Sequence, residues 1–457
     1  MGVSSRIMEP EAPRMLERAS GKVPSEGKRQ QPQNASGANS RRNARGGRRS
    51  RATQPSQLGQ EQPTQPAKVD EAKESAATAG TPSAIIEALV AAEISAAAQQ
   101  AECERLCQLI EACSAAREEV RSVGGIQAVL AAMRAHPADT GLLVAACNAI
   151  YQISVCHLQN STAFVSEGAL KEVVGAMERH EHVEELQEAG CRVLRNALLC
   201  DKECQDAVAT AGGIQAVLKA MGTHSEVACL QEAGCRVLKE LAAYHSANQQ
   251  EILSLGGIQV VLRAMESHAG CDMMQEAACG VIRNLVAGNA DHQECVASRG
   301  GIESILQTMV AHEGATNVQW AACWALFCLC AQNEDVQAEV EAYGCISAVL
   351  KAMEIHLTDA RVQEAASWVI KELAPHIAKG PNRSALSRAI QAVLKALEKF
   401  AVDAKVQTAA SSALRKLALH DSSGWVKTTC LGRCGRLGRS AVSHALATIE
   451  ENGEDSE

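Results

Sequence analysis

The 457-residue sequence predicts an all-α fold built from helical repeats of 44 residues. A motif such as GGIQAVLKAM recurs along the chain, and its leading apolar residue returns every 44 residues. Apolar residues within the motif follow helical rather than strand spacing. Hydrophobic residues make up 46% of the chain but aromatic residues only 2%, which favours closely packed helices over a β-sandwich. A period of this length is typical of solenoids and propellers, and the lack of two-residue alternation favours the solenoid.

Each repeat is expected to hold a short helix, a glycine turn, a second helix, a loop and a longer third helix. Ile214, Val217 and Met221 lie on one face of the second helix. A glycine precedes this helix in six of the seven units, because glycine accepts the left-handed conformation that ends one helix sharply before the next. The apolar anchors of the second helices are Ile126, Leu170, Ile214, Ile258, Ile302, Ile346 and Ile390.

This pattern resembles the armadillo repeat, a three-helix unit of about 40–47 residues. The resemblance implies a right-handed superhelical solenoid over residues 83–420, made of a degenerate N-terminal cap and seven repeats. In the cap, residues 99–120 match a third helix and the next short helix, whereas 85–92 is expected to be out of register by three residues. The seventh unit has Arg388 in place of its glycine and is expected to form the other end.

The flanking regions differ from the repeats in composition. Residues 1–80 lack apolar periodicity and are expected to be disordered and basic, with 14 Lys and Arg against 8 Asp and Glu. Residues 421–457 are expected to form a tail with a capping helix and an acidic end. The stretch 28–51 contains no acid, and its basic core could be an import signal, a nucleic-acid-binding arm or a solvated tail. The arginines of this core are Arg41, Arg42, Arg45, Arg48, Arg49 and Arg51.

The sequence contains no apolar run long enough for a transmembrane segment and no secretory signal. The start MGVSSR resembles a myristoylation signal but has Arg6 where Ser or Thr is required. We therefore expect a cytoplasmic protein that could also be nuclear, whose 19 cysteines are thiols.

Two columns of chemically versatile residues recur at the repeat period. One column is Cys147, Cys191, Cys235, Cys279, Cys323, Ser367 and Ser411, and the other is His136, His180, His224, His268, His312 and His356. Neighbouring helices pack about 8–10 Å apart, which is too far for the members of either column to share one metal ion. The cysteines follow two small residues and are expected to be chosen for size. The histidines are expected to satisfy carbonyls at helix C-termini.

No catalytic or cofactor-binding motif is present, so we expect neither an enzyme nor a bound cofactor or metal. Cys430 and Cys434 form a lone CxxxC, which is a weak metal or redox signal.

The varying face of the third helices is the expected partner-binding surface. Positions four apart share a helix face, and those equivalent to 188, 192 and 196 differ between units. By the armadillo resemblance, this stripe lines a concave groove that holds an extended peptide or helix of a protein partner. The expected contacts are Arg192, Asn196, Arg236, Asn284, Trp320, Trp324 and Trp368. The alternative for the three tryptophans is that they fill gaps in the core or cover the stack of helices.

The leading hypothesis is therefore a non-enzymatic interaction scaffold or adaptor. The alternatives are a nuclear import adaptor resembling importin-α, and a nucleic-acid-associated protein that uses residues 28–51. Importin-α-like proteins hold basic peptides with Trp and Asn one turn apart on the third helix. No unit here has both, and Arg192 and Arg236 would repel a basic cargo.

Overall fold

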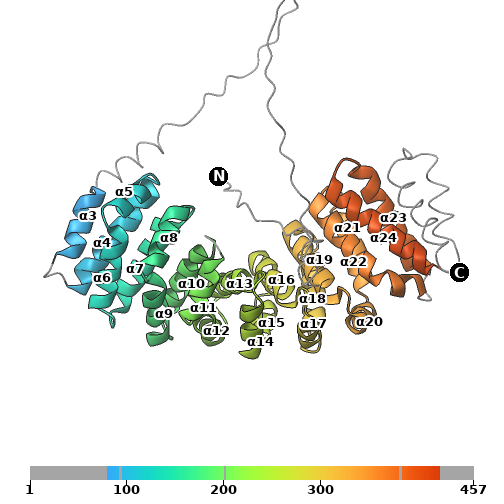
Figure 1. The fold of residues 1–457 in the computed structure, drawn as a ribbon, viewed down its shortest axis with the longest axis horizontal. Coiled ribbons are helices and arrows are strands. Elements are labelled where there is room, and N and C mark those ends of the chain that lie inside the picture. The colour runs from blue at the N-terminus through green and yellow to red at the C-terminus, as the bar shows by residue number, and fades with distance from the viewer. Residues whose placement is uncertain (1–79, 92–94, 200–201, 380–382, 422–457) are drawn as a thin grey trace, which may run out of the picture. The chain divides into compact units, whose positions relative to one another are not determined.

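The computed structural model describes residues 80–91, 95–199, 202–379 and 383–421, and every regular element in them is an α-helix (Figure 1). The predicted all-α fold is confirmed for this part of the chain. The basic stretch 28–51, Cys430 and Cys434, and the predicted C-terminal capping helix lie outside the described residues. None of the described helices combines the length and apolar character that a membrane span needs.

The helices occur in sets that follow one another along the chain. The first helices are α5 (Ala116–Ser122), α8 (Leu158–Ser166), α11 (Glu203–Thr210), α14 (Ser246–Ser254), α17 (Ala290–Ala297) and α20 (Glu334–Ala342). The second helices are α6 (Gly125–Ala135), α9 (Ala169–Arg179), α12 (Gly213–Thr223), α15 (Gly257–Ser267), α18 (Gly301–Ala311) and α21 (Cys345–Ile355). The third helices are α7 (Thr140–Ser154), α10 (Glu184–Leu198), α13 (Ala228–Ala242), α16 (Asp272–Val286), α19 (Thr316–Cys330), α22 (Ala360–Lys379) and α24 (Ala404–His420).

The third helices pack on one another in chain order. α7 packs on α10, α10 on α13, and so on to α24, and Figure 1 shows neighbouring members of this series side by side. A small residue also lets the second helix of the same repeat approach the third closely. A Cβ added to Gly190 would lie 2.5 Å from the sulfur of Met177, and Cys191 beside it is fully buried. The expectation that this cysteine column occupies tightly packed core positions agrees with its burial.

A left-handed glycine separates the first helix from the second in six repeats. These residues are Gly124, Gly168, Gly212, Gly256, Gly300 and Gly344, and each has a φ of between 73° and 86°. Where Arg388 replaces the glycine, the break is absent and one helix, α23 (Arg383–Lys399), continues through both positions. The glycine therefore sets the turn, because other residues pay a steric cost in this conformation.

A buried glutamine ties the second helix of a repeat to the third. Gln187 donates its Nε2 to the carbonyl oxygens of Met177 at 2.9 Å and His180 at 3.0 Å, at the C-terminal end of α9. Carbonyls at a helix end have no partner within the helix. The same two bonds are made by Gln231, Gln275, Gln319, Gln363 and Gln407. We call these six residues the glutamine column.

The histidine column ties each repeat to the one before it. His180 ends α9, and its Nε2 donates to the carbonyl oxygen of Pro137 in the preceding repeat at 2.8 Å. The same bond is made by His224, His268, His312 and His356. The histidines thus satisfy carbonyls, as expected, but those of the neighbouring repeat rather than of their own helix.

The N-terminal cap is in register with the repeats, contrary to expectation. Gln99 on α4 (Ala96–Ala112) donates its Nε2 to the carbonyl of Leu89 on α3 (Pro82–Val90) at 3.1 Å. This separation of ten residues is the one between Gln187 and Met177. Leu89 therefore occupies the position of the repeated methionine, and the three-residue offset predicted for 85–92 is wrong. The register of the cap relative to the repeats is defined by the residue whose carbonyl accepts the glutamine hydrogen bond. The weak sequence match in the cap did not reveal this residue.

Gly212→Ala should lower the free energy of unfolding by about 1–2 kcal/mol, because Gly212 has a φ of 86°. The matched control is Gly222→Ala in the same helix, where nothing lies within 4 Å of an added Cβ and φ is not positive. That substitution should raise stability by about 0.5–1 kcal/mol. Urea titrations of the full chain provide the comparison, and equal effects at the two sites would contradict the role assigned to the turn.

Gln231→Met should lower the free energy of unfolding by about 1–3 kcal/mol, because it leaves the buried carbonyls of Met221 and His224 without their side-chain donor. Gln215→Met on the exposed face of α12 removes the same amide and should stay within about 0.5 kcal/mol of wild type. If thermal melts gave the two variants the same melting temperature, the glutamine column would not be a stabilising element.

Candidate functional site

The outward face of the third helices is the candidate site, but it follows a different line from the predicted stripe. On α10, Arg192 is exposed and Glu188 and Arg195 are half-buried, whereas Asn196 is buried. With 3.6 residues per turn, position 195 falls about 20° from position 188, whereas position 196 falls about 80° away. The face therefore runs through positions equivalent to 188, 192 and 195. We call it the third-helix face.

Arg192 and Arg236 lie on this face, as expected. The guanidinium of Arg192 pairs with Glu188 and lies 6.0 Å from the ring centroid of Tyr151 on the preceding third helix. Arg236 pairs with Glu232 at 2.9 Å. Both pairs join residues four apart in one helix, where exposed ion pairs contribute little to stability. Both guanidinium groups therefore remain accessible enough to exchange partners.

Asn196 and Asn284 are buried, with 4% and 6% of their surfaces exposed, so the expected placement at the surface is wrong. The Nδ2 of Asn284 donates to the carbonyl oxygen of Lys239 on α13 at 2.8 Å. The Nδ2 of Asn196 donates to Ser154 Oγ at 3.1 Å. The amides thus join neighbouring third helices. The physical reason is the 80° offset, which turns position 196 toward the adjacent helix.

The three tryptophans are buried rather than exposed, with 8% of Trp320, 3% of Trp324 and 8% of Trp368 accessible. The Trp324 and Phe327 rings meet edge-on at 5.5 Å between centroids, and Phe327 lies 5.9 Å from Trp368. Large rings on adjacent helices cover one another, which the sequence could not reveal. Trp368 Nε1 is buried without an acceptor among the described residues, although an indole N–H normally finds one.

Sequence reasoning missed the column equivalent to position 195. It contains Tyr151, Arg195, Lys239, Arg283, Phe327, Lys371 and Arg415 in successive repeats. Each of the five cations is half-buried or exposed. The sequence indicated this column, because position 195 lies seven residues after position 188 and therefore on nearly the same side of the helix. It was overlooked because a strict spacing of four selects position 196 instead.

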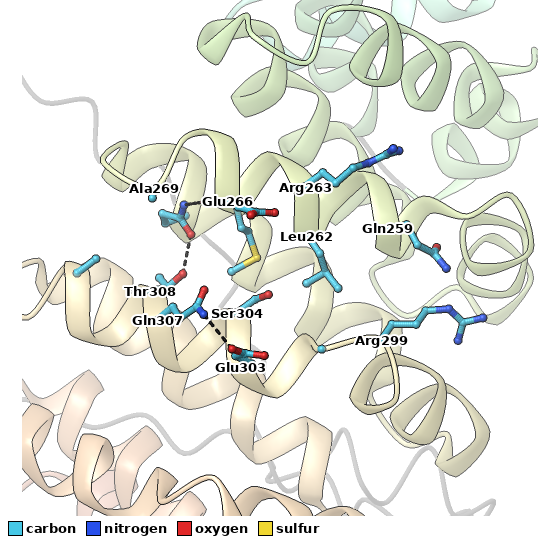
Figure 2. Close-up of a pocket in the computed structure, with 14 residues that line it drawn as sticks. Gln259, Leu262, Arg263, Glu266, Ala269, Arg299, Glu303, Ser304, Gln307 and Thr308 are labelled. Atoms are coloured by element: carbon cyan, nitrogen blue, oxygen red, sulfur yellow. Dashed lines mark hydrogen bonds between the residues drawn. The ribbon is translucent and has the colours of Figure 1, made fainter.

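A cavity of about 780 Å³ lies between the second helices α15 and α18. Figure 2 shows Leu262 of α15 and Ser304 and Gln307 of α18 facing each other across it. Its other lining groups include Arg263 and Glu303. The lining mixes opposite charges with amides and hydroxyls, and Thr308 Oγ1 donates to Gln275 Oε1 at 2.7 Å.

The cysteine column is chemically inert in the folded chain. Burial raises the pKa of the Cys147, Cys191, Cys235, Cys279 and Cys323 thiols to about 12. The thiolate is the reactive form and the metal ligand, so these groups are neither nucleophiles nor ready ligands. Within the described part of the chain, no three His, Cys, Asp or Glu side chains are grouped so that they could hold a metal ion.

Comparisons with known families and structures identify the fold. A model of the LRRK2 ARM repeat matches residues 54–252, and a model of a spinocerebellar ataxia type 10 protein domain matches 230–320. An engineered protein aligns at 18% identity over 84% of this chain and 94% of its own, with a TM-score of 0.67. The resemblance to armadillo-repeat proteins is confirmed.

Two further solved structures align with this chain. A chain from a structure of the cadherin and β-catenin interaction, described as controlled by a phosphorylation switch, aligns at 19% identity. The alignment covers 80% of this chain and 70% of that one, with a TM-score of 0.66. A designed armadillo repeat protein aligns over 52% of this chain with a TM-score of 0.46. No curated protein matches the sequence. None of these comparisons indicates a catalytic family.

The five column thiols should resist alkylation by iodoacetamide in the native full chain at pH 8, whereas the exposed Cys113 and Cys156 should react. Peptide mass spectrometry identifies the alkylated sites, and column thiols that reacted as fast as Cys113 would contradict their burial.

The same raised pKa values predict that the folded chain loses stability at alkaline pH, which urea titrations at several pH values measure. Unfolded thiols ionise near pH ~8.5, so the stability that these groups contribute is present below that pH and lost as the pH rises toward 12.

Proposed function

We propose that this chain is a non-enzymatic interaction scaffold that binds a segment of a partner protein along the third-helix face. As part of this proposal, the repeats wind into a right-handed superhelix, and the third-helix face lines its concave side. The contacts would come from Arg192 and Arg236, together with further half-buried residues of the same face such as Glu276.

The observation that carries the proposal is the contrast between what repeats and what varies. The glutamine, histidine and glycine positions keep their residue type and their hydrogen bonds or turns through at least five repeats. The position equivalent to Arg192 is instead Asn148, Arg192, Arg236, Gly280, Trp324, Trp368 and Ser412. Where this position is exposed or half-buried, as at Asn148, Arg192, Arg236 and Ser412, packing leaves the residue free to be matched to a ligand.

The solved structures support the same conclusion at the level of the fold. The structure that concerns cadherin and β-catenin describes an armadillo-type relative in a protein interaction. Because the sequence identity is 19%, the likeness concerns the fold, and the partner of this chain is not inferred from it.

Site-specific photo-crosslinking tests the proposal. A benzoylphenylalanine placed at Asn148, Arg192 or Thr408 on the third-helix face should capture one protein partner in cells, identified by mass spectrometry. Arg134, Lys219 and Lys351, which lie exposed on second helices, provide matched control positions. The same reagent there should yield no adduct with that partner. Adducts formed equally from both sets, or only from the second helices, would refute binding along the third-helix face.

A further inference from the structure

Five of the seven residues in the column equivalent to position 195 are cations. They are Arg195, Lys239, Arg283, Lys371 and Arg415, and we call them the basic column. They lie on α10, α13, α16, α22 and α24, which belong to one continuous series of packed third helices. Neighbouring third helices are about 8–10 Å apart, so Arg195, Lys239 and Arg283 follow at single spacings and Arg283 and Lys371 at two. Tyr151 and Phe327 occupy the remaining two positions.

Three cations of the column have no acidic partner among the described residues. Arg283 Nε donates only to the neutral amide oxygen of Asn284, at 3.1 Å. Arg195 Nε is buried and has no hydrogen-bond acceptor within the described part of the chain. Arg415 is exposed, and no ion pair to it occurs among the described side chains. Two acids of the third-helix face are paired with other cations: Glu188 with Arg192 and Glu232 with Arg236.

The other two cations have weak local pairs. Lys239 contacts Glu240 at 3.1 Å, and Lys371 contacts Glu372 at 2.9 Å. The acids of both pairs follow the lysine directly in the chain. Partly exposed pairs of this kind contribute little, so a stronger acceptor can displace them.

The local field at Arg195 favours an added anion. Burial, and then the nearby positive charge of Arg236, lower the pKa of the Arg195 guanidinium from its usual value. Both causes disfavour the charged form of the side chain, and the opposing effects of Glu240, Tyr151 and Glu232 are smaller in sum. A carboxylate placed against the half-buried Arg195 side chain would offset the positive charge of Arg236.

Gly280 gives the column its continuity between α13 and α16. A Cβ at this position would lie 2.6 Å from Lys239 Cδ and 3.1 Å from Cγ. The aliphatic chain of Lys239 therefore crosses onto α16, toward the repeat that holds Arg283. Any larger residue at position 280 would displace the lysine. The absence of a side chain there therefore lets Lys239 lie against α16, the helix that carries Arg283.

We propose that the basic column binds an extended, acidic segment of a partner protein, a proposal that rests on the function assigned to the third-helix face. An extended chain advances about 3.3 Å per residue, so two to three residues span one repeat. Carboxylates at that spacing would each meet a cation. Nucleic acid fits less well, because Glu276 and Glu364 lie beside the cations on the same face and would repel a continuous phosphate backbone.

The test measures binding of the full-length chain to fluorescein-labelled 16-residue peptides by fluorescence anisotropy. A peptide of eight Glu-Ser repeats should bind, and peptides with Gln or Lys in place of Glu should not. Replacing Arg195, Lys239 and Arg283 together by Gln should weaken binding by about ten-fold, the factor that three exposed ion pairs supply. The affinity should fall as salt is added, because screening weakens each pair.

The matched control replaces Arg134, Lys219 and Arg263 by Gln. These residues lie exposed on second helices, and the change in charge and residue types is the same. The control should bind as wild type does. Thermal melts of both variants exclude misfolding, and Arg195→Lys, which keeps the charge, should retain most of the affinity. Equal losses in the two triple variants, or binding of the Gln peptide as tight as that of the Glu peptide, would overturn the proposal.

Two other occupants are separated by the same assay. Tighter binding of single-stranded RNA than of the Glu peptide, lost in the basic-column variant, would overturn a protein ligand. The chain has its own acidic segment in residues 450–457. If removal of that segment tightened peptide binding only when the basic column is intact, the column would serve the chain's own tail instead. Failure of the peptide while third-helix crosslinks persist would reject the acidic chemistry but not the scaffold.

Discussion

The fold depends on how the backbone carbonyls at the ends of the second helices are satisfied. A helix leaves its last carbonyls without partners, and in an array these ends are buried between neighbours. Gln187 and its equivalents supply donors within a repeat, and His180 and its equivalents supply donors between repeats. Each bond holds one helix at a fixed distance and rotation from the next. The repeated geometry therefore follows from a polar constraint as much as from the apolar core.

This constraint leaves one surface free. The second helices and the buried side of the third helices must present the same groups in every repeat, because each contacts an equivalent neighbour. The exposed and half-buried positions of the third-helix face are not constrained in this way, and their residues change from Asn148 to Arg192 to Ser412. Binding specificity in a repeat array can reside there without disturbing the packing. The basic column is one product of this freedom.

Much of the fold was predictable, but the site was predictable only in part. The glycine before each second helix and the apolar spacing indicated helices because they reflect local conformation. Arg192 and Arg236 were placed correctly, since they lie one turn from Glu188 and Glu232. Asn196 and the tryptophans were misplaced. Asn196 was misplaced because an offset of about 80° turns it toward the adjacent helix. The tryptophans were misplaced because their burial depends on rings of the neighbouring helix.

The sequence by itself determined the all-α class, the repeat boundaries that glycine sets, and the residue types of every column. The tertiary structure alone decided which columns face a neighbour and which face outward. It gave the histidines carbonyl partners in the preceding repeat, and it placed Leu89 in register through Gln99. The reason is that hydrogen bonds between repeats join residues about 43 positions apart, and local propensity contains no information about contacts at that range.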